Sequence, residues 1–171
     1  RRLMLQTLDV DGPVYIRLGK GGDPILSRAD LPCEIGKAIP LRAGRDALIV
    51  ATGICLQVAL EAAAALETQG INAGVMHVHT LKPLDAAAIL EKAASVPVIL
   101  TIEEHTLMGG LGSAVAEIIA EAGFNPGKRF KRLGIPDVFP DQYGSQAGLM
   151  KRYGITAPAA VEAVATLLKA D

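Results

Sequence analysis

Two adjacent acidic residues followed by a histidine, Glu103-Glu104-His105, form the segment of this sequence best suited to proton transfer. They follow an apolar run that predicts a buried strand, and the sites of open α/β sheets gather beyond the carboxyl ends of strands. A carboxylate beside an imidazole can act as a general acid or base. No nucleophile motif of the type G-x-S-x-G accompanies them. We therefore favour an interface or a structural network here, with catalysis as the alternative.

A glycine-rich stretch follows directly, with Gly109, Gly110 and Gly112 at the start of an amphipathic pattern. A glycine turn that opens a helix can bind a phosphate group, because its free backbone N–H groups point at the anion. The match to G-x-G-x-x-G is incomplete, since Val115 takes the place of the third glycine and no acidic residue about 20 positions on can hold a ribose. We expect a tight turn or an interface in preference to a dinucleotide site.

Two histidines, His77 and His79, are two positions apart in a predicted strand and therefore face the same side. Two imidazoles on one face could begin a metal site. The third histidine lies in another segment, and no cysteine or carboxylate is spaced with the pair. We favour a packed or hydrogen-bonded pair and expect no metal.

Two cations, Arg17 and Lys20, flank a glycine at the end of the first predicted strand. Two positive charges at a strand end can hold a phosphate group. A solvated pair of surface charges explains the same residues equally well. The residue types alone leave both interpretations open.

The elements that must position these residues alternate between short apolar runs and amphipathic stretches. Continuous apolar runs predict strands buried on both faces, and stripes at helical spacing predict helices, three of which Asp85, Ser145 and Thr156 can cap. This alternation predicts a doubly wound, three-layer α/β/α fold with an open, mostly parallel sheet. The predicted strands cover residues 14–18, 37–41, 46–51, 73–78, 98–102 and 130–133.

A loop rich in glycine and proline, residues 19–34, separates the first predicted strand from this regular pattern. We predict a domain boundary there, with residues 1–34 as the tail and linker of one domain and residues 35–171 as another. A lone strand is unstable, so we expect the second domain to fold independently and the first segment to be poorly anchored. The chain opens at Arg1 in place of methionine, which we interpret as the mark of a fragment.

The composition of the 171-residue chain is that of a globular protein, with 50% hydrophobic and 20% charged residues. Its net charge of −1 and the lack of a basic tract argue against nucleic acid as a partner. No apolar run reaches the roughly 18 residues of a membrane span, so we expect no membrane partner. Cys33 and Cys55 are far apart and predict reduced thiols in a cytoplasmic protein.

Several blocks of the sequence resemble the transketolase family in the same order. Residues 12–21 are similar to the final strand of that family's pyrimidine-binding domain, and residues 50–53 to the first strand-to-helix turn of its C-terminal domain. Residues 80–85 resemble the second strand-to-helix connection. The most specific block is residues 101–105 followed by residues 109–113.

The resemblance implies the C-terminal portion of a thiamine-diphosphate-dependent enzyme that transfers a two-carbon ketol unit between phosphosugars. The parent enzyme would hold thiamine diphosphate and Mg²⁺ with a Gly-Asp-Gly…Asn motif that this chain lacks. We therefore expect the chain alone to bind neither group and to be inactive. Lys20, with Arg17 nearby, falls at the basic position that contacts the sugar phosphate in the family.

The resemblance also implies partners. The rest of the enzyme, as N-terminal domains or as a separate subunit, would join this chain in a homodimer or heterotetramer, to which the chain contributes packing and dimer contacts. Two other functions remain open: the C-terminal part of a 1-deoxy-xylulose-5-phosphate synthase, or the docking domain of a 2-oxo-acid dehydrogenase β subunit. The candidates for the interface are Glu103, Glu104, His105, Gly109, Gly110 and Gly112.

Overall fold

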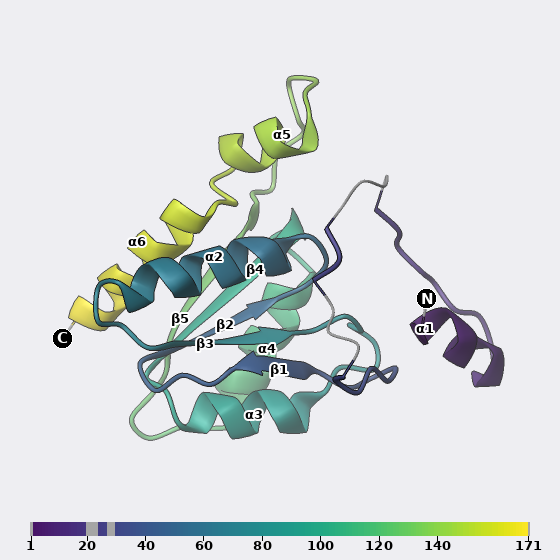
Figure 1. Cartoon of the computed structure of the whole chain (residues 1–171), viewed down its shortest axis with the longest axis horizontal. Helices are drawn as coiled ribbons and strands as arrows, with labels where there is room; N and C mark the ends of the chain where they lie inside the picture. The colour runs from purple at the N-terminus through teal and green to yellow at the C-terminus, as the bar shows by residue number, and fades with distance from the viewer. Residues whose placement is uncertain (1, 20–23, 27–29, 171) are drawn as a thin grey trace.

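The structure, a computed structural model, describes residues 2–19, 24–26 and 30–170. Within these residues a five-stranded sheet has the order β1-β3-β2-β4-β5 (Figure 1). Four strands run parallel, and β1 pairs with β3 in the antiparallel sense at one edge. The mixed, mostly parallel sheet confirms the predicted fold class. The strands are β1 (Ile39–Arg42), β2 (Ala47–Ala51), β3 (Ala73–His77), β4 (Val98–Thr106) and β5 (Arg129–Ile135).

Helices cover both faces of this sheet and complete three layers (Figure 1). On one face α2 (Cys55–Glu67) and α6 (Ala157–Lys169) bury a core that includes Ile49. On the other face α3 (Ala86–Ala94) and α4 (Leu111–Glu121) bury a second core that includes Val50. Successive side chains of a strand point to opposite faces, so an apolar run such as β2 supplies both cores at once.

Side-chain caps begin three helices where the sequence predicts them. Each capping oxygen accepts a hydrogen bond from an amide that the first helical turn leaves without a partner. Asp85 also accepts from Ala38 N at 3.0 Å, which joins the start of α3 to the segment that leads into β1. The capped pairs are Asp85 with Ala88 of α3 at 3.2 Å, Ser145 with Gly148 of α5 (Gln146–Arg152) at 3.1 Å, and Thr156 with Ala159 of α6 at 3.3 Å.

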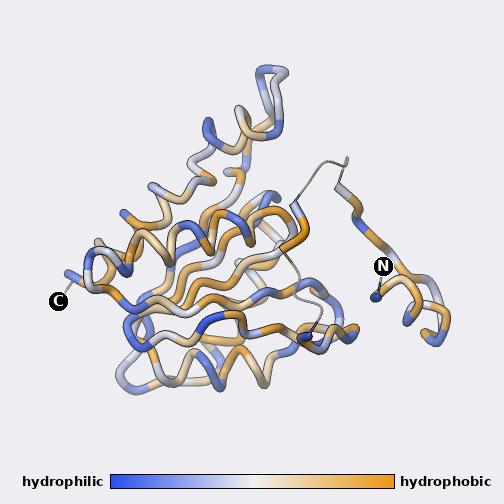
Figure 2. The backbone as a smooth tube through the Cα atoms, viewed as in Figure 1, coloured by the Kyte–Doolittle hydropathy of each residue, from blue (hydrophilic) through white to orange (hydrophobic). Residues whose placement is uncertain are grey.

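The N-terminal segment differs from the prediction. The strand predicted at residues 14–18 does not form; these residues carry no regular structure. A strand gains its stability from a neighbour that pairs with it, and these residues pair with none of the described strands. Tyr15 and Leu18 are 89% and 75% exposed, and Figure 2 shows apolar residues of this segment away from the sheet. The short helix α1 (Arg2–Gln6) and the 3-10 turn η1 (Thr7–Asp9) were not predicted.

A single glutamine ties α1 to the chain that precedes β1. The Gln6 amide donates to Cys33 O at 2.6 Å and accepts from Ile35 N at 2.9 Å. The amide nitrogen and the amide oxygen of Gln6 thus both find hydrogen-bond partners in residues 33–35. The N-terminal helix therefore lies against residues 33–35, at the start of the second predicted domain.

Two glycines allow the turn before β2 to approach β3 closely. A Cβ on Gly44 would overlap the backbone of Gly74. We predict that Gly44→Ala lowers the free energy of unfolding by about 2 kcal/mol or more, because neither backbone can move without disturbing the sheet.

The matched control for this substitution is Gly127→Ala, since a Cβ there meets nothing within 4 Å. We expect it to change the free energy of unfolding by less than about 0.5 kcal/mol. Urea unfolding curves of both variants and the parent chain give the comparison. Parent-like stability of Gly44→Ala would contradict the close contact of the two glycines.

Candidate functional site at the carboxyl edge of the sheet

The connections of the sheet place a topological switch point at the carboxyl ends of β2 and β4. The chain leaves β2 for β3 through α2 on one face, and leaves β4 for β5 through α4 on the other. Open α/β sheets bind ligands in the crevice at such a point. The Glu103–His105 segment lies near the end of β4, and the turn at Thr52 follows β2, with Thr52 N donating to Ile102 O at 3.4 Å. The predicted chemical residues therefore lie at this edge.

Glu103 is buried in this edge and closes the N-terminus of α4. Only 1% of the residue is exposed. Its Oε2 accepts a hydrogen bond from Leu111 N and its Oε1 accepts one from Gly112 N, both at 2.7 Å. Free amides and the positive end of the helix dipole stabilise a carboxylate at this position. An external phosphate would need the same amides, so the protein's own carboxylate fills this helix N-terminus.

The glycines of the loop make room for this carboxylate. A Cβ on Gly110 would overlap the Glu103 carboxylate. A Cβ on Gly112 would lie 2.7 Å from Arg132 Cδ and 2.8 Å from Thr101 Oγ1. Gly109 has a φ of +74°, where side chains are strained. The three glycines thus have conformational and packing roles in a tight turn.

Arg132 of β5 fixes the same loop, and the sequence reasoning missed it. Its Nη1 donates to Leu107 O at 2.6 Å and to Ser113 Oγ at 3.1 Å. The Ser113 hydroxyl in turn donates to Leu107 O at 3.0 Å and accepts from Gly109 N at 3.1 Å. The available signal was a charged residue within the predicted strand at 130–133. Only the parallel pairing of β4 and β5 brings it beneath the glycine loop.

His105 does not join Glu103 in an acid–base pair. The imidazole is exposed, and its Nδ1 lies 3.0 Å from Thr106 O. A carbonyl only accepts, so Nδ1 is the protonated ring nitrogen in this contact. The Glu103 carboxylate is bound to the amides of α4. Glu103 and His105 therefore have separate hydrogen-bond partners in this structure.

Glu104 brings together three segments that are far apart in sequence. Its Oε1 accepts a hydrogen bond from the Gln146 amide of α5 at 2.9 Å. Arg17 donates through Nη1 to the Glu104 carbonyl oxygen at 2.9 Å, and its Nη2 lies 3.6 Å from Glu104 Oε2. Arg17 is therefore held by a backbone oxygen and a carboxylate of the same residue. Lys20, the other phosphate candidate, lies outside the described residues.

The six interface candidates divide into two groups. Those at the surface can contact another chain, whereas the buried ones act within the domain, since the α4 cap covers them. The surface group is Glu104, His105 and Gly109, and the buried group is Glu103, Gly110 and Gly112.

His77 is the last residue of β3, and His79 follows two residues later. Their rings lie edge to face, with centroids 5.6 Å apart and an interplanar angle of 72°. His79 Nδ1 is 2.9 Å from Thr80 Oγ1. Burial lowers the pKa of His77 to about 4, with a further effect of His79. Burial, and then the charge of Arg2, lower the pKa of His79. Both rings are therefore neutral near pH 7.

Cys55 begins α2 at the same edge but does not have the properties of a nucleophile. The residue is fully buried. Burial first, and then the carboxylates of Glu104 and Glu103, raise the pKa of its thiol to about 12, against a smaller opposing effect of Arg17. The thiolate is the reactive form of cysteine, so Cys55 has a packing role.

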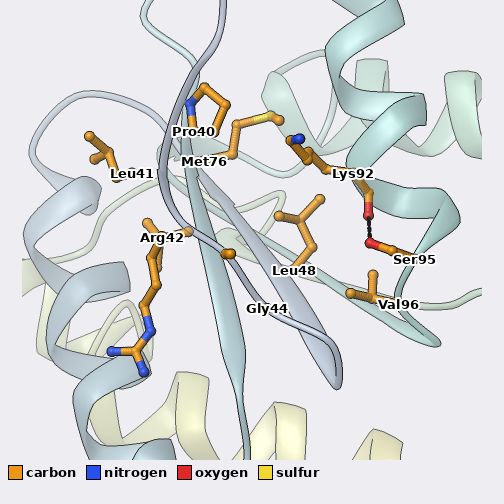
Figure 3. A pocket seen from close by; sticks show the side chains of 11 residues that line it. Pro40, Leu41, Arg42, Gly44, Leu48, Met76, Lys92, Ser95 and Val96 are labelled. Atoms are coloured by element: carbon orange, nitrogen blue, oxygen red, sulfur yellow. Dashed lines mark hydrogen bonds between the residues drawn. The ribbon is translucent and has the colours of Figure 1, made fainter. Parts of the chain in front are cut away.

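A cavity of about 310 Å³ lies elsewhere, beside the edge strand β1 and the last turn of α3 (Figure 3). Leu48, Met76 and Val96 help to line it. The cations at its rim are paired, Arg42 with Glu67 at 2.9 Å and Lys92 with its neighbour in sequence at 2.6 Å. None of the predicted site residues that the structure describes contributes to this cavity.

The described residues do not fit a magnesium–diphosphate group. Among residues 2–19, 24–26 and 30–170, no three His, Cys, Asp or Glu side chains are grouped so that they could hold a metal ion. Mg²⁺ at a diphosphate takes carboxylate and other oxygen ligands, and the α4 amides are already bound by Glu103. No described helix has the length and apolar character needed to cross a membrane.

The α4 cap leads to a prediction about stability. Glu103→Ala should lower the free energy of unfolding by about 3 kcal/mol, because two buried amides lose a charged acceptor. Glu117→Ala, an exposed site on the same helix, should change it by less than about 0.5 kcal/mol. Urea unfolding measures both changes. Equal effects of the two substitutions would show that the Glu103 cap contributes nothing.

The His77 environment leads to a prediction about pH. Its folded pKa of about 4 lies below the ordinary value of 6.5, so the unfolded chain takes up the proton first as pH falls. The resulting stability is complete above pH 6.5 and is lost between pH 6.5 and 4. We expect the melting temperature of His77→Gln to fall less than that of the parent across this interval. If the melting temperatures of the two proteins fell by the same amount from pH 7 to 4, the low pKa of His77 would be refuted.

Curated relatives match most of this chain over a part of their own length. An uncharacterised transketolase family protein of Sinorhizobium fredii is 44% identical over 148 residues, which cover 85% of this chain and 42% of the relative. A 1-deoxy-D-xylulose-5-phosphate synthase of Heliobacterium modesticaldum is 39% identical over 98% of this chain and 26% of the relative. The chain thus spans less than half the length of these two relatives.

A solved structure of a split gene transketolase, described as an inactive β4 tetramer, has the same fold. It is 39% identical, with a TM-score of 0.88, and the match covers 98% of this chain and 54% of that one. The family model described as the transketolase C-terminal domain matches residues 36–160. From these agreements, and from the mixed sheet with its carboxyl-edge turn, this chain belongs to the transketolase C-terminal domain family.

Proposed function

We propose that this chain is the C-terminal portion of a thiamine-diphosphate-dependent transketolase that transfers a two-carbon ketol unit between phosphosugars. The observation that carries the proposal is the likeness to the split gene transketolase chain, which extends over 98% of this sequence. That likeness includes the N-terminal segment, which the family model leaves out. On this proposal residues 1–34 are the tail of a pyrimidine-binding domain and residues 35–171 are the C-terminal domain.

The cofactor would be bound by the other part of the enzyme. Thiamine diphosphate supplies the carbanion-stabilising chemistry of such a reaction when it is bound. The N-terminus of α4 cannot take its diphosphate, because Glu103 occupies the amides there. The role of this chain would be to hold the linker, through Arg17, and to present Lys20 toward the substrate phosphate. Arg17 is paired with Glu104, and Lys20 is proposed as the phosphate ligand on the resemblance alone.

The partner would be the segment that carries the diphosphate motif, as preceding domains or as a separate subunit. We propose assembly with it into a homodimer or heterotetramer. Exposed apolar side chains of residues 4–18 support such a partner, since exposed apolar surface is stabilised when another chain covers it. The side chains in question are those of Met4, Leu5, Leu8, Val10, Val14, Tyr15, Ile16 and Leu18.

A second candidate function is supported by the relative from Heliobacterium modesticaldum. Its 39% identity extends over 98% of this chain. On this alternative the parent enzyme condenses pyruvate with glyceraldehyde 3-phosphate, and the same C-terminal fold has the same supporting role. The two candidates differ in the donor substrate, which an activity assay separates.

We predict that the 171-residue chain alone gives no heat of binding with thiamine diphosphate and Mg²⁺, and no ketol transfer. The physical reason is that Glu103 already binds the α4 amides and that the described residues contain no cluster of side chains that could hold a metal ion. Mixing with the polypeptide that carries the Gly-Asp-Gly…Asn motif should restore transfer from a ketose phosphate to an aldose phosphate. The measurements are calorimetric titration and a coupled ketol-transfer assay.

Two results would count against this proposal. Tight cofactor binding by the isolated chain would show that it holds the diphosphate itself. Condensation of pyruvate by the reconstituted enzyme, without ketol transfer from a ketose phosphate, would replace the transketolase function by the synthase. Lysozyme in place of this chain is the control for non-specific stabilisation of the other polypeptide.

A further inference from the structure

In residues 30–170, every large apolar side chain that is exposed lies in a loop at the carboxyl edge of the sheet. The loops at the opposite edge, such as residues 122–128 between α4 and β5, expose none. Exposed apolar surface is stabilised when another chain covers it, so the carboxyl edge is the side suited to a partner. The exposed side chains are Leu81 after β3, Met108 after β4, and Val138, Phe139 and Tyr143 after β5.

The loop that carries Phe139 and Tyr143 is held to α5 between these two residues. Arg152, in the last turn of α5, donates to both carboxylate oxygens of Asp141, at 2.7 and 2.8 Å, and to Gln142 Oε1 at 3.1 Å. A bidentate guanidinium–carboxylate pair fixes geometry as well as distance. Both aromatic rings are nevertheless fully exposed. The bonds to Arg152 thus hold the loop while its aromatic side chains remain in solvent.

Two exposed aromatic side chains are a large part of an interface. Each buries about 150–250 Å² when it is covered. Phe139 and Tyr143 together would supply about half of the roughly 800 Å² that each partner buries in an interface of standard size. Aromatic residues are also enriched among the few side chains that carry most of the binding energy.

The N-terminal segment reaches the same edge of the sheet. Arg17 donates to the Glu104 carbonyl oxygen at 2.9 Å, and Gln146, which follows Tyr143 by three residues, donates to Glu104 Oε1 at 2.9 Å. Figure 1 shows α1 and the residues after it on the side of the molecule where the parallel strands end. A domain that packs on residues 2–18 therefore stands at the carboxyl edge.

The N-terminal segment itself needs such a domain. Residues 14–18 have the β-branched and aromatic composition of a strand but pair with none of the described strands. Tyr15 and Leu18 are exposed. A strand is stabilised when a neighbouring strand completes its hydrogen bonds. One domain can therefore supply that strand and cover the exposed loops of the same edge.

We propose that the carboxyl-edge loops, with Phe139 and Tyr143 as the anchors, are the docking surface for the domain to which residues 2–18 belong. This inference rests on the proposed function for the identity of that domain, the pyrimidine-binding domain. The occupant is an apolar protein surface that receives two aromatic rings. Its polypeptide would carry the rest of that domain together with the diphosphate motif.

The first experiment compares hydrogen exchange in this chain alone and in its mixture with that polypeptide. We expect the amides of residues 137–144 to exchange at least about tenfold more slowly in the mixture, because docking suppresses local opening of the loop. The loop at residues 122–128 lies at the opposite edge and is the matched control, with unchanged exchange. Equal exchange at residues 137–144 with and without the polypeptide would overturn the proposal.

The second experiment measures the affinity for the polypeptide by calorimetric titration. Phe139→Ala and Tyr143→Ala should each weaken binding about tenfold or more. Tyr143→Phe keeps the ring and should stay within about threefold of the parent. Lys131→Ala removes an exposed charge from β5 and should bind as the parent does. All three positions are exposed, so parental urea unfolding curves would separate a loss of binding from a loss of folding.

The alternative occupant of this surface is a second copy of the chain. Sedimentation velocity of the parent and of Phe139→Ala, each without the polypeptide, tests it. Self-association that the substitution abolishes, with unchanged affinity for the polypeptide, would overturn the proposal. Failure of the parent chain to bind the polypeptide would overturn it as well.

The docking surface and the proposed function can fail separately. A reconstituted enzyme that requires Phe139 and Tyr143 for assembly, but condenses pyruvate without ketol transfer, would retain the surface and replace the transketolase by the synthase. Ketol transfer in an enzyme whose assembly is unaffected by both alanine substitutions would retain the function and overturn the surface. Ketol transfer together with weakened assembly of both variants is the result that supports the two proposals.

Discussion

The carboxylate of Glu103 at the N-terminus of α4 is the interaction on which the carboxyl edge of this domain depends. A buried charge is costly unless it is paired or hydrogen-bonded, and here two amides and the helix dipole satisfy it. The cap requires a residue without a Cβ at Gly110, because a side chain there would occupy the space of the carboxylate. It also anchors the backbone at Glu103, and the next residue, Glu104, lies where the register of β4 with β5 becomes irregular, between Ile102 and Thr106.

The alternation of side chains along β4 separates the structural carboxylate from the accessible one. Thr101 and Glu103 lie two positions apart and face α4, where Gly112 and Arg132 pack. Glu104 faces the other side, where it meets Gln146 and Arg17. Two adjacent glutamates therefore take opposite roles for a purely geometric reason. Glu103 closes the N-terminus of α4, and Glu104 contacts α5 and the N-terminal segment.

The turn before α4 shows how a sheet edge of a kind that often binds nucleotides can have one helix N-terminus already filled by the protein. The sheet order creates the switch point, and the glycine turn has the right location for an anion. The anion there is part of the protein. Fold alone does not imply function, and in this chain the Glu103 side chain decides whether the N-terminus of α4 is available to an external anion.

The sequence by itself determined the layered fold, because apolar runs, helical stripes and the capping residues Asp85, Ser145 and Thr156 act over a few neighbours. Its one wrong element, the strand at residues 14–18, needed a partner strand that none of the described residues supplies. The roles of Glu103, Glu104 and Arg132 depended on which segments the sheet brings together. Arg17 and Glu104 are 87 positions apart, and local patterns carry no information about a contact at that separation. Only the tertiary structure could pair them.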